Sequence, residues 1–114
     1  MGDKKMTMKA DLWFPTVIWQ DTLKQVNNSE LIEYIYKIKE TDTGKTASNY
    51  GGWQSLSHDL ITERPLPVER FIQTLQKCVN ECAKMAGLMD LQICNYWWNI
   101  NYKGDYNQPH NHRM

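Results

Sequence analysis

The chain has 114 residues, 41% of them hydrophobic, and its 13 basic and 13 acidic side chains give a net charge of zero. This length suffices for one domain with one core, so residues 1–114 are treated as a single domain. The balanced charge lacks the basic field that nucleic-acid binding or attachment to anionic lipid requires, and it predicts neither partner.

Cysteine usage and the first residues bear on the cellular compartment. The three cysteines are an odd number and form no Cys-x-x-Cys pair, which does not indicate a disulfide framework. Cys78 and Cys82 share one face of a predicted helix, where a free buried thiol is the usual case. Residues 1–13 include no apolar stretch suited to a signal sequence or a bilayer span. We therefore expect a cytoplasmic protein.

Residues 12–19 are rich in aromatic and β-branched side chains and contain one proline, which is typical of an edge strand. A helix is predicted over residues 28–40. Asn27 followed by Glu30 resembles a capping box at its start. Its apolar face comprises Leu31, Ile35 and Ile38.

Residues 41–57 have neither helical nor strand periodicity and are predicted to be a loop, which Trp53 anchors to the core. A second helix begins near Pro65 and Pro67 and ends at Gly87. Its apolar positions recur at steps of three and four residues: Val68, Phe71, Ile72, Leu75, Val79, Cys82 and Ala86.

Residues 91–102 change to a period of two and are predicted to form a strand. One face comprises Cys94, Tyr96, Trp98, Ile100 and Tyr102. The other, of mixed polarity, comprises Ile93, Asn95, Trp97, Asn99 and Asn101. Such a face suits either solvent or the wall of a wet pocket, and a turn is expected at residues 103–105.

His110 and His112 are two positions apart near the end of the chain. On an extended backbone this spacing directs both imidazoles to the same side, so both could reach one metal ion. Neutral imidazole is a good ligand for iron, zinc or copper. Solvent exposure is the more common role of two such histidines, and the pattern alone leaves both readings open. His58 has no neighbours at a metal or nucleophile spacing and is read as structural or exposed.

Three blocks together resemble a 2-oxoglutarate- and iron(II)-dependent oxygenase family found in marine bacteria and their phages. They are FPTVIW at residues 14–19, SNYGGWQS at residues 48–55, and WWNINYKGDYNQPHNH at residues 97–112. They occur in the order of the family, and the last block is the most specific. The resemblance covers nearly the whole chain from residue 12 onward.

The resemblance implies a double-stranded β-helix, or jelly roll, in which iron(II) is held by a facial triad and 2-oxoglutarate chelates the same metal, leaving one position for O₂. It implies His110 and His112 as metal ligands. His110 matches the first ligand of the general pattern, whereas His112 stands where a carboxylate is usual. Four residues would line or support the pocket: Trp97, Asn99, Asn101 and Asn107.

The departures from the family pattern concern the end of the chain. Arg113 and Met114 follow His112 where the family continues with further strands, a distal histidine and a basic residue for 2-oxoglutarate. We therefore expect an α+β chain in which two helices pack on an incomplete sheet, the N-terminal part of a jelly-roll oxygenase. Such a fragment, whose substrate the sequence does not indicate, is expected to be inactive by itself.

The alternative is a non-catalytic α+β binding module. In this reading the aromatic C-terminal strand and the loop around Trp53 form a contact surface, because exposed tyrosine and tryptophan commonly anchor protein interfaces. The asparagines would then satisfy local backbone groups instead of lining a pocket.

Overall fold

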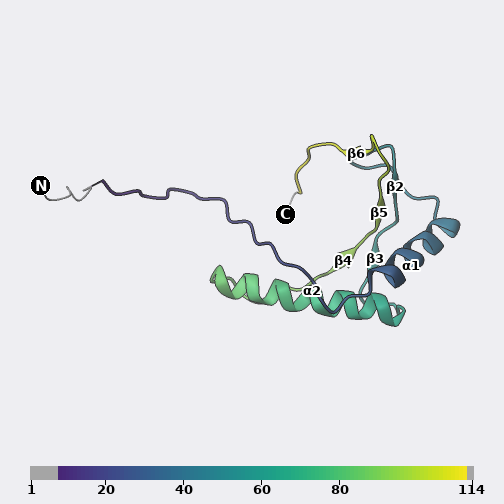
Figure 1. Ribbon diagram of the computed structural model, residues 1–114, viewed down its shortest axis with the longest axis horizontal. Coiled ribbons are helices and arrows are strands. Elements are labelled where there is room, and N and C mark those ends of the chain that lie inside the picture. Colours follow the sequence, from purple (N-terminus) through teal and green to yellow (C-terminus); the bar gives the residue numbers. More distant parts are fainter. Residues whose placement is uncertain (1–7, 113–114) are drawn as a thin grey trace, which may run out of the picture.

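The computed structural model describes residues 8–112. Within them the chain forms two helices, α1 (Asn28–Thr41) and α2 (Leu66–Met85), and six short strands (Figure 1). The strands are β1 (Asn49–Tyr50), β2 (Trp53–Gln54), β3 (His58–Asp59), β4 (Asn95–Tyr96), β5 (Asn99–Ile100) and β6 (Tyr106–Asn107). The predicted α+β class is confirmed. Neither helix has the length and apolarity needed to span a lipid bilayer.

The strands pair in nested order, with α2 between the two halves. β1 pairs with β6, β2 with β5 and β3 with β4, always antiparallel. Each pair is a sheet of two strands, and none is closed or curled. In Figure 1 the pairs follow one another as a narrow ribbon that rises from the two helices.

The ribbon changes register between β1–β6 and β2–β5. Gly51 and Gly52 alone connect β1 to β2, whereas residues 101–105 connect β5 to β6. Within that longer connection the Asp105 amide donates to the Tyr102 carbonyl (3.0 Å), and the Tyr102 amide donates to the Asp105 carboxylate (2.8 Å). The turn predicted at residues 103–105 is therefore present.

A serine takes part in the ladder between β2–β5 and β3–β4. The Ser55 amide donates to the Trp98 carbonyl (2.9 Å). In the opposite direction the Trp98 amide donates to the Ser55 hydroxyl oxygen (2.9 Å). Ser55 is fully buried, so its hydroxyl satisfies a backbone group that would otherwise lose its partner.

Both helices begin and end close to the predicted residues because their caps are encoded locally. The Asn27 side chain accepts from the Glu30 amide at the start of α1 (3.1 Å). After α2, Gly87 adopts a φ of 68°, and the Leu88 amide donates to the Ala83 carbonyl (2.9 Å). This pair of features is a Schellman motif, in which glycine avoids the strain of a left-handed conformation.

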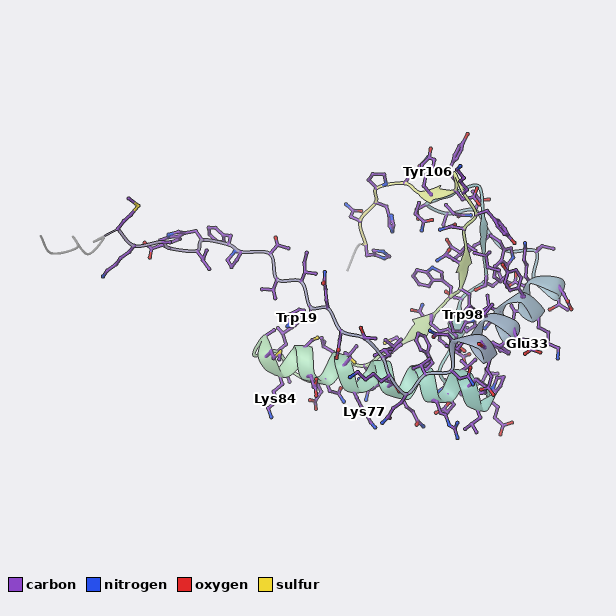
Figure 2. The ribbon with its side chains drawn as sticks, in the orientation of Figure 1. Trp19, Glu33, Lys77, Lys84, Trp98 and Tyr106 are labelled. Carbon is purple, nitrogen blue, oxygen red and sulfur yellow. The ribbon has the colours of Figure 1, made fainter. Side chains whose placement is uncertain are left out.

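The core lies where the ribbon meets the helices. It comprises Leu31, Trp53, Val68, Ile72, Trp98 and Ile100. Trp98, which Figure 2 labels, contacts α2 through Phe71, with ring centroids 6.0 Å apart. Trp53 anchors its segment as predicted, because its ring is buried and its indole N–H donates to the Asp42 carbonyl (2.9 Å).

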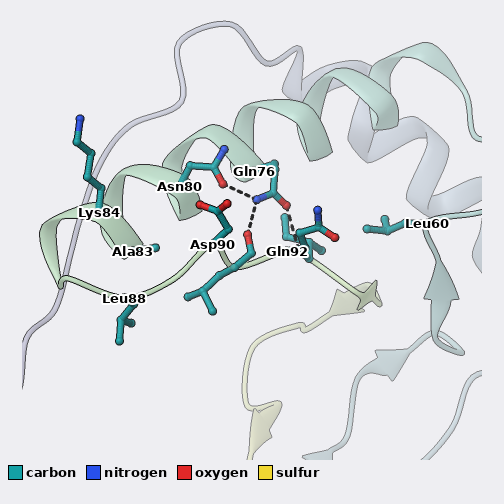
Figure 3. Close-up of a pocket in the computed structure, with 10 residues that line it drawn as sticks. Leu60, Gln76, Asn80, Ala83, Lys84, Leu88, Asp90 and Gln92 are labelled. Carbon is teal, nitrogen blue, oxygen red and sulfur yellow. Dashed lines mark hydrogen bonds between the residues drawn. The ribbon is translucent and has the colours of Figure 1, made fainter.

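The segment after α2 is held to that helix by one side chain. The Gln76 amide nitrogen donates to the Leu91 carbonyl (2.8 Å), and its carbonyl oxygen accepts from the Ile93 amide (3.0 Å). Figure 3 shows Gln76 reaching from α2 to this segment, with Asn80 beside it. Gln76 therefore replaces the backbone partners that residues 91–93 would have in a sheet.

Three predictions about strands were wrong in whole or in part. Residues 12–19 form no strand, and Figure 1 shows most of this segment extended away from the rest of the molecule, although Trp19 reaches α2. The predicted loop of residues 41–57 contains β1 and β2, and β3 follows it. The predicted strand of residues 91–102 is limited to β4 and β5. Its alternation is confirmed in the central part, where Trp98 and Ile100 are buried while Trp97 and Asn99 are exposed.

Candidate functional site

A groove beside the two outer strand pairs, β1–β6 and β2–β5, contains both predicted metal ligands. Its volume is about 450 Å³. The lining residues come from the segment before β1, from β2, and from the last part of the described chain: Lys45, Ala47, Ser48, Gln54, Trp97, Asn107, Gln108, Pro109, His110 and His112. The groove therefore combines segments that lie far apart in the sequence.

The pairing of β1 with β6 positions the histidine segment. Tyr50 and Tyr106 are directly opposite in this pair, and their rings stack with centroids 5.0 Å apart. One residue further, the Gln108 amide donates to the Ser48 carbonyl (2.6 Å). Pro109 has no amide hydrogen and cannot extend the ladder, so the chain leaves the ribbon immediately before His110.

The two imidazoles lie close together, as the spacing of two predicts. Their ring centroids are 5.0 Å apart and their planes are inclined by 61°. The Nδ1 atom of His110 lies 2.8 Å from the Gln108 carbonyl oxygen. Because a carbonyl can only accept, Nδ1 is the donor in this contact, and in the neutral imidazole Nε2 then keeps its lone pair. Histidines that bind metals commonly have this arrangement.

Two imidazoles that bind one metal ion have a predictable separation of their ring centres. An imidazole nitrogen binds a metal at about 2.1 Å, which places the metal about 3.2 Å from the ring centre. Two rings that subtend an angle of about 100° at the metal then have centres about 5 Å apart. The observed 5.0 Å agrees with this value.

The number of ligands is smaller than a facial triad needs. Within residues 8–112 no group of three or more histidine, cysteine, aspartate or glutamate side chains is placed to hold a metal ion. Arg113, which follows His112, lies outside the described residues. The described residues therefore bring two histidine side chains together and place no third candidate ligand beside them.

Of the predicted supporting residues, two lie at the groove. Trp97 and Asn107 line it, whereas Asn99 and Asn101 do not. Asn99 is exposed opposite Gln54 in the β2–β5 pair. The Asn101 side chain instead lies over Gly52, 2.5 Å from where a Cβ atom would be. Trp97, Asn99 and Asn101 share one face of the predicted strand but do not meet in one place. Asn101 is displaced because the chain leaves β5 after Ile100.

The sequence patterns did not identify the side of the groove that faces the histidine segment. Lys45, Ser48 and Gln54 line it, although they lie within or beside the segment predicted to be a loop. No local pattern marks them, because their proximity to the histidines depends on the pairing of β1 with β6. The block of residues 48–55, on which the family resemblance partly rests, was the one signal near them.

His58 lies in β3, which belongs to the pair next to the helices, away from the histidine pair. Its ring stacks on Tyr96 with centroids 5.1 Å apart, and burial raises the pKa of the Tyr96 phenol. The prediction of a structural or exposed role agrees with this half-buried packing. Cys78 and Cys82 are free and half-buried on α2.

Comparisons with models of protein families, with curated proteins and with solved structures find no significant match to this chain.

Proposed function

We propose that this chain is part of a 2-oxoglutarate- and iron(II)-dependent oxygenase, in which His110 and His112 provide two of the iron ligands. The single observation that supports this most is the imidazole pair, with centroids 5.0 Å apart and the His110 Nδ1 atom held by the Gln108 carbonyl. The sequence blocks that resemble the family lead to the same two residues.

The proposed oxygenase would have a jelly-roll architecture. The nested ribbon of β1 to β6 would be an edge of that barrel, and further strands would come from outside residues 8–112. A third ligand would come from there or from another chain. Iron(II) bound together with 2-oxoglutarate supplies the capacity to activate O₂ for oxidation of a substrate.

The residues of this chain would hold and orient the reactants. The hydrogen bond to Gln108 would hold the hydrogen of His110 on Nδ1, so that Nε2 would be available to bind the metal. Trp97 and Asn107 form part of the groove wall, where they would restrict the position of a substrate and exclude water. With two protein ligands, affinity for iron is expected to be low, and residues 1–114 alone are expected to show no turnover.

The test is an anaerobic titration of the chain with iron(II), with and without 2-oxoglutarate, followed by the visible charge-transfer band. The band is expected only when both are present. It should disappear in His110→Ala and persist in Asn111→Ala, a matched change of the exposed residue between the two histidines. A band of equal intensity in His110→Ala, or no band in the unchanged chain, would contradict the proposal for residues 1–114.

A second candidate function is a binding module, favoured by exposed aromatic rings beside the same groove. Tyr50 is 60% exposed and Tyr106 is 49% exposed although the two rings stack, and Trp97 is 38% exposed. Aromatic side chains in such positions can anchor a protein partner. Partner binding that survives His110→Ala and is lost in Tyr106→Ser would favour this function over the oxygenase.

A further inference from the structure

A polar pocket of about 270 Å³ lies at β3–β4, the strand pair next to the helices in Figure 1. Side chains from α1, from both strands and from the segment before α2 line it. It shares no lining residue with the histidine groove. The titratable side chains that line it are Tyr34, His58, Asp59, Glu63, Arg64 and Tyr96. The pocket is therefore a second cluster of ionisable groups in a different part of the fold.

One nitrogen of the His58 ring is buried without a partner. Within residues 8–112 the Nε2 atom forms no hydrogen bond, although the ring is fixed by stacking on Tyr96, with planes inclined by 19°. A buried polar atom without a partner costs free energy, because it has lost the water that would solvate it. In a neutral ring with its hydrogen on Nδ1, Nε2 is an acceptor that an N–H donor would satisfy.

The charged groups at this pocket leave an excess of negative charge. Arg64 is already neutralised, because its Nε atom lies 2.6 Å from a carboxylate oxygen of Glu69. Asp59 and Glu63 form no ion pair with another described residue. The Thr62 amide donates to the Asp59 carboxylate (2.8 Å), and this bond lowers the pKa of that carboxyl below 3.8. Asp59 is therefore ionised at neutral pH.

Two tyrosines give the pocket aromatic walls. Tyr34 on α1 and Tyr96 on β4 are both half-buried, and burial raises the pKa of both phenols. Both rings are therefore neutral at physiological pH. A neutral phenol oxygen can accept an N–H, and the face of an aromatic ring attracts a cation. The walls and the carboxylates thus favour a ligand of the same sign.

We propose that this pocket binds a guanidinium group, which belongs to a small organic cation or to an arginine side chain. A guanidinium is planar, stacks on aromatic rings and carries several N–H donors. His58 Nε2 would accept one of them, and Asp59 and Glu63 would supply the counter-charge. An inorganic cation is less suited, because the described part of the chain gathers no group of three potential metal ligands. The site goes beyond the proposed oxygenase and needs no iron.

The test is an NMR titration of the 114-residue chain at neutral pH in metal-free buffer, followed by the ring resonances of Tyr96. Methylguanidinium should shift them saturably. Methylurea has nearly the same shape without the charge and should not shift them. Tetramethylammonium has the charge without N–H donors and should bind more weakly than methylguanidinium. Acetylarginine amide binding at least as tightly as methylguanidinium would identify an arginine side chain as the ligand, and weaker binding would identify a small guanidine compound.

Three variants separate the contact with His58 from the overall charge. His58→Phe retains a ring on Tyr96 and should weaken methylguanidinium binding about tenfold, the upper range for one hydrogen bond. Asp59→Asn retains an oxygen for the Thr62 amide and should weaken binding about threefold, as for an exposed ion pair. Glu81→Gln makes the same charge change on α2, about 18 Å along the helix from Glu69, and should leave binding unchanged.

Urea unfolding of His58→Phe shows whether a loss of binding reflects a loss of structure. This variant removes the unpartnered nitrogen, so its midpoint should be equal to or above that of the unchanged chain. The proposal would be overturned by equal affinity for methylguanidinium and methylurea, by equal affinity for tetramethylammonium, or by no saturable shift. Unchanged affinity in His58→Phe, or equal loss in Asp59→Asn and Glu81→Gln, would overturn it as well.

Discussion

Replacement of Gly52 by alanine tests whether the close contact between the two halves of the ribbon holds the structure together. Gly52 has a φ of 67°, and a Cβ atom there would lie 2.7 Å from the Ile100 carbonyl oxygen and 2.5 Å from the Asn101 side chain. Asn101 is exposed and can rotate away. The Ile100 carbonyl cannot move without disturbing the pair of β2 with β5.

Gly87→Ala is the matched control, because it has the same backbone strain without the contact. Gly87 has a φ of 68°, and a Cβ atom there would meet nothing within 4 Å. Its replacement should lower the free energy of unfolding by about 1 kcal/mol, the cost of a left-handed alanine. Gly52→Ala should cost this amount and in addition about 1–3 kcal/mol for overpacking.

Urea unfolding followed by tryptophan fluorescence measures both variants, since Trp53 and Trp98 are buried. The midpoint should fall further for Gly52→Ala than for Gly87→Ala. Equal destabilisation by the two replacements would refute the reasoning, because the contact with β5 would then contribute nothing.

Three further predictions concern other contacts of the ribbon and its neighbours. Ser55→Ala should lower the free energy of unfolding by about 1–3 kcal/mol in urea, because the buried Trp98 amide loses its acceptor. Gln76→Leu should speed hydrogen exchange at the Ile93 amide, which NMR can follow, while leaving the helix content by circular dichroism unchanged. The hydrogen bond from the Thr62 amide lowers the pKa of the Asp59 carboxyl below its usual 3.8. The stabilisation from Asp59 is therefore present above pH 3.8 and is lost as the pH falls through the lowered pKa. Asp59→Asn should remove this part of the acid dependence of the free energy of unfolding.

The helices could be predicted because their signals are local. Asn27 accepts from the amide three residues later, and Gly87 ends α2 with bonds inside its last turns. Apolar positions three and four apart face the core, where Leu31, Val68 and Ile72 are buried. Each of these features depends on residues within a few positions, so the sequence pattern contains them.

The strands could not be located in the same way because pairing is non-local. Residues 12–19 have strong strand propensity but no partner in the described chain, and a strand without a partner forms no ladder. Residues 49–59 have glycines and polar side chains that suggest a loop, yet they pair with residues 95–107. The partner, more than the propensity, decides where these strands form.

The candidate site was predictable on one side only. The spacing of His110 and His112 predicted that the rings would be neighbours, and they are. Lys45 and Gln54 reach the same groove through the register of β1 with β6, which no local pattern indicates. Asn101 was assigned to the pocket from strand periodicity, and the connection after Ile100 places it over Gly52 instead.

The nested order of the strand pairs has a consequence for how the chain folds. Closing β3 against β4 encloses the shortest intervening segment and therefore costs the least chain entropy, and each later pair closes onto the one before. The strand pairs should form in the order β3–β4, β2–β5 and β1–β6, and they should open in the reverse order. The histidine segment is joined to the rest of the chain through β6, in the outermost pair, so the histidine side of the groove is expected to meet the other side last during folding and to separate from it first.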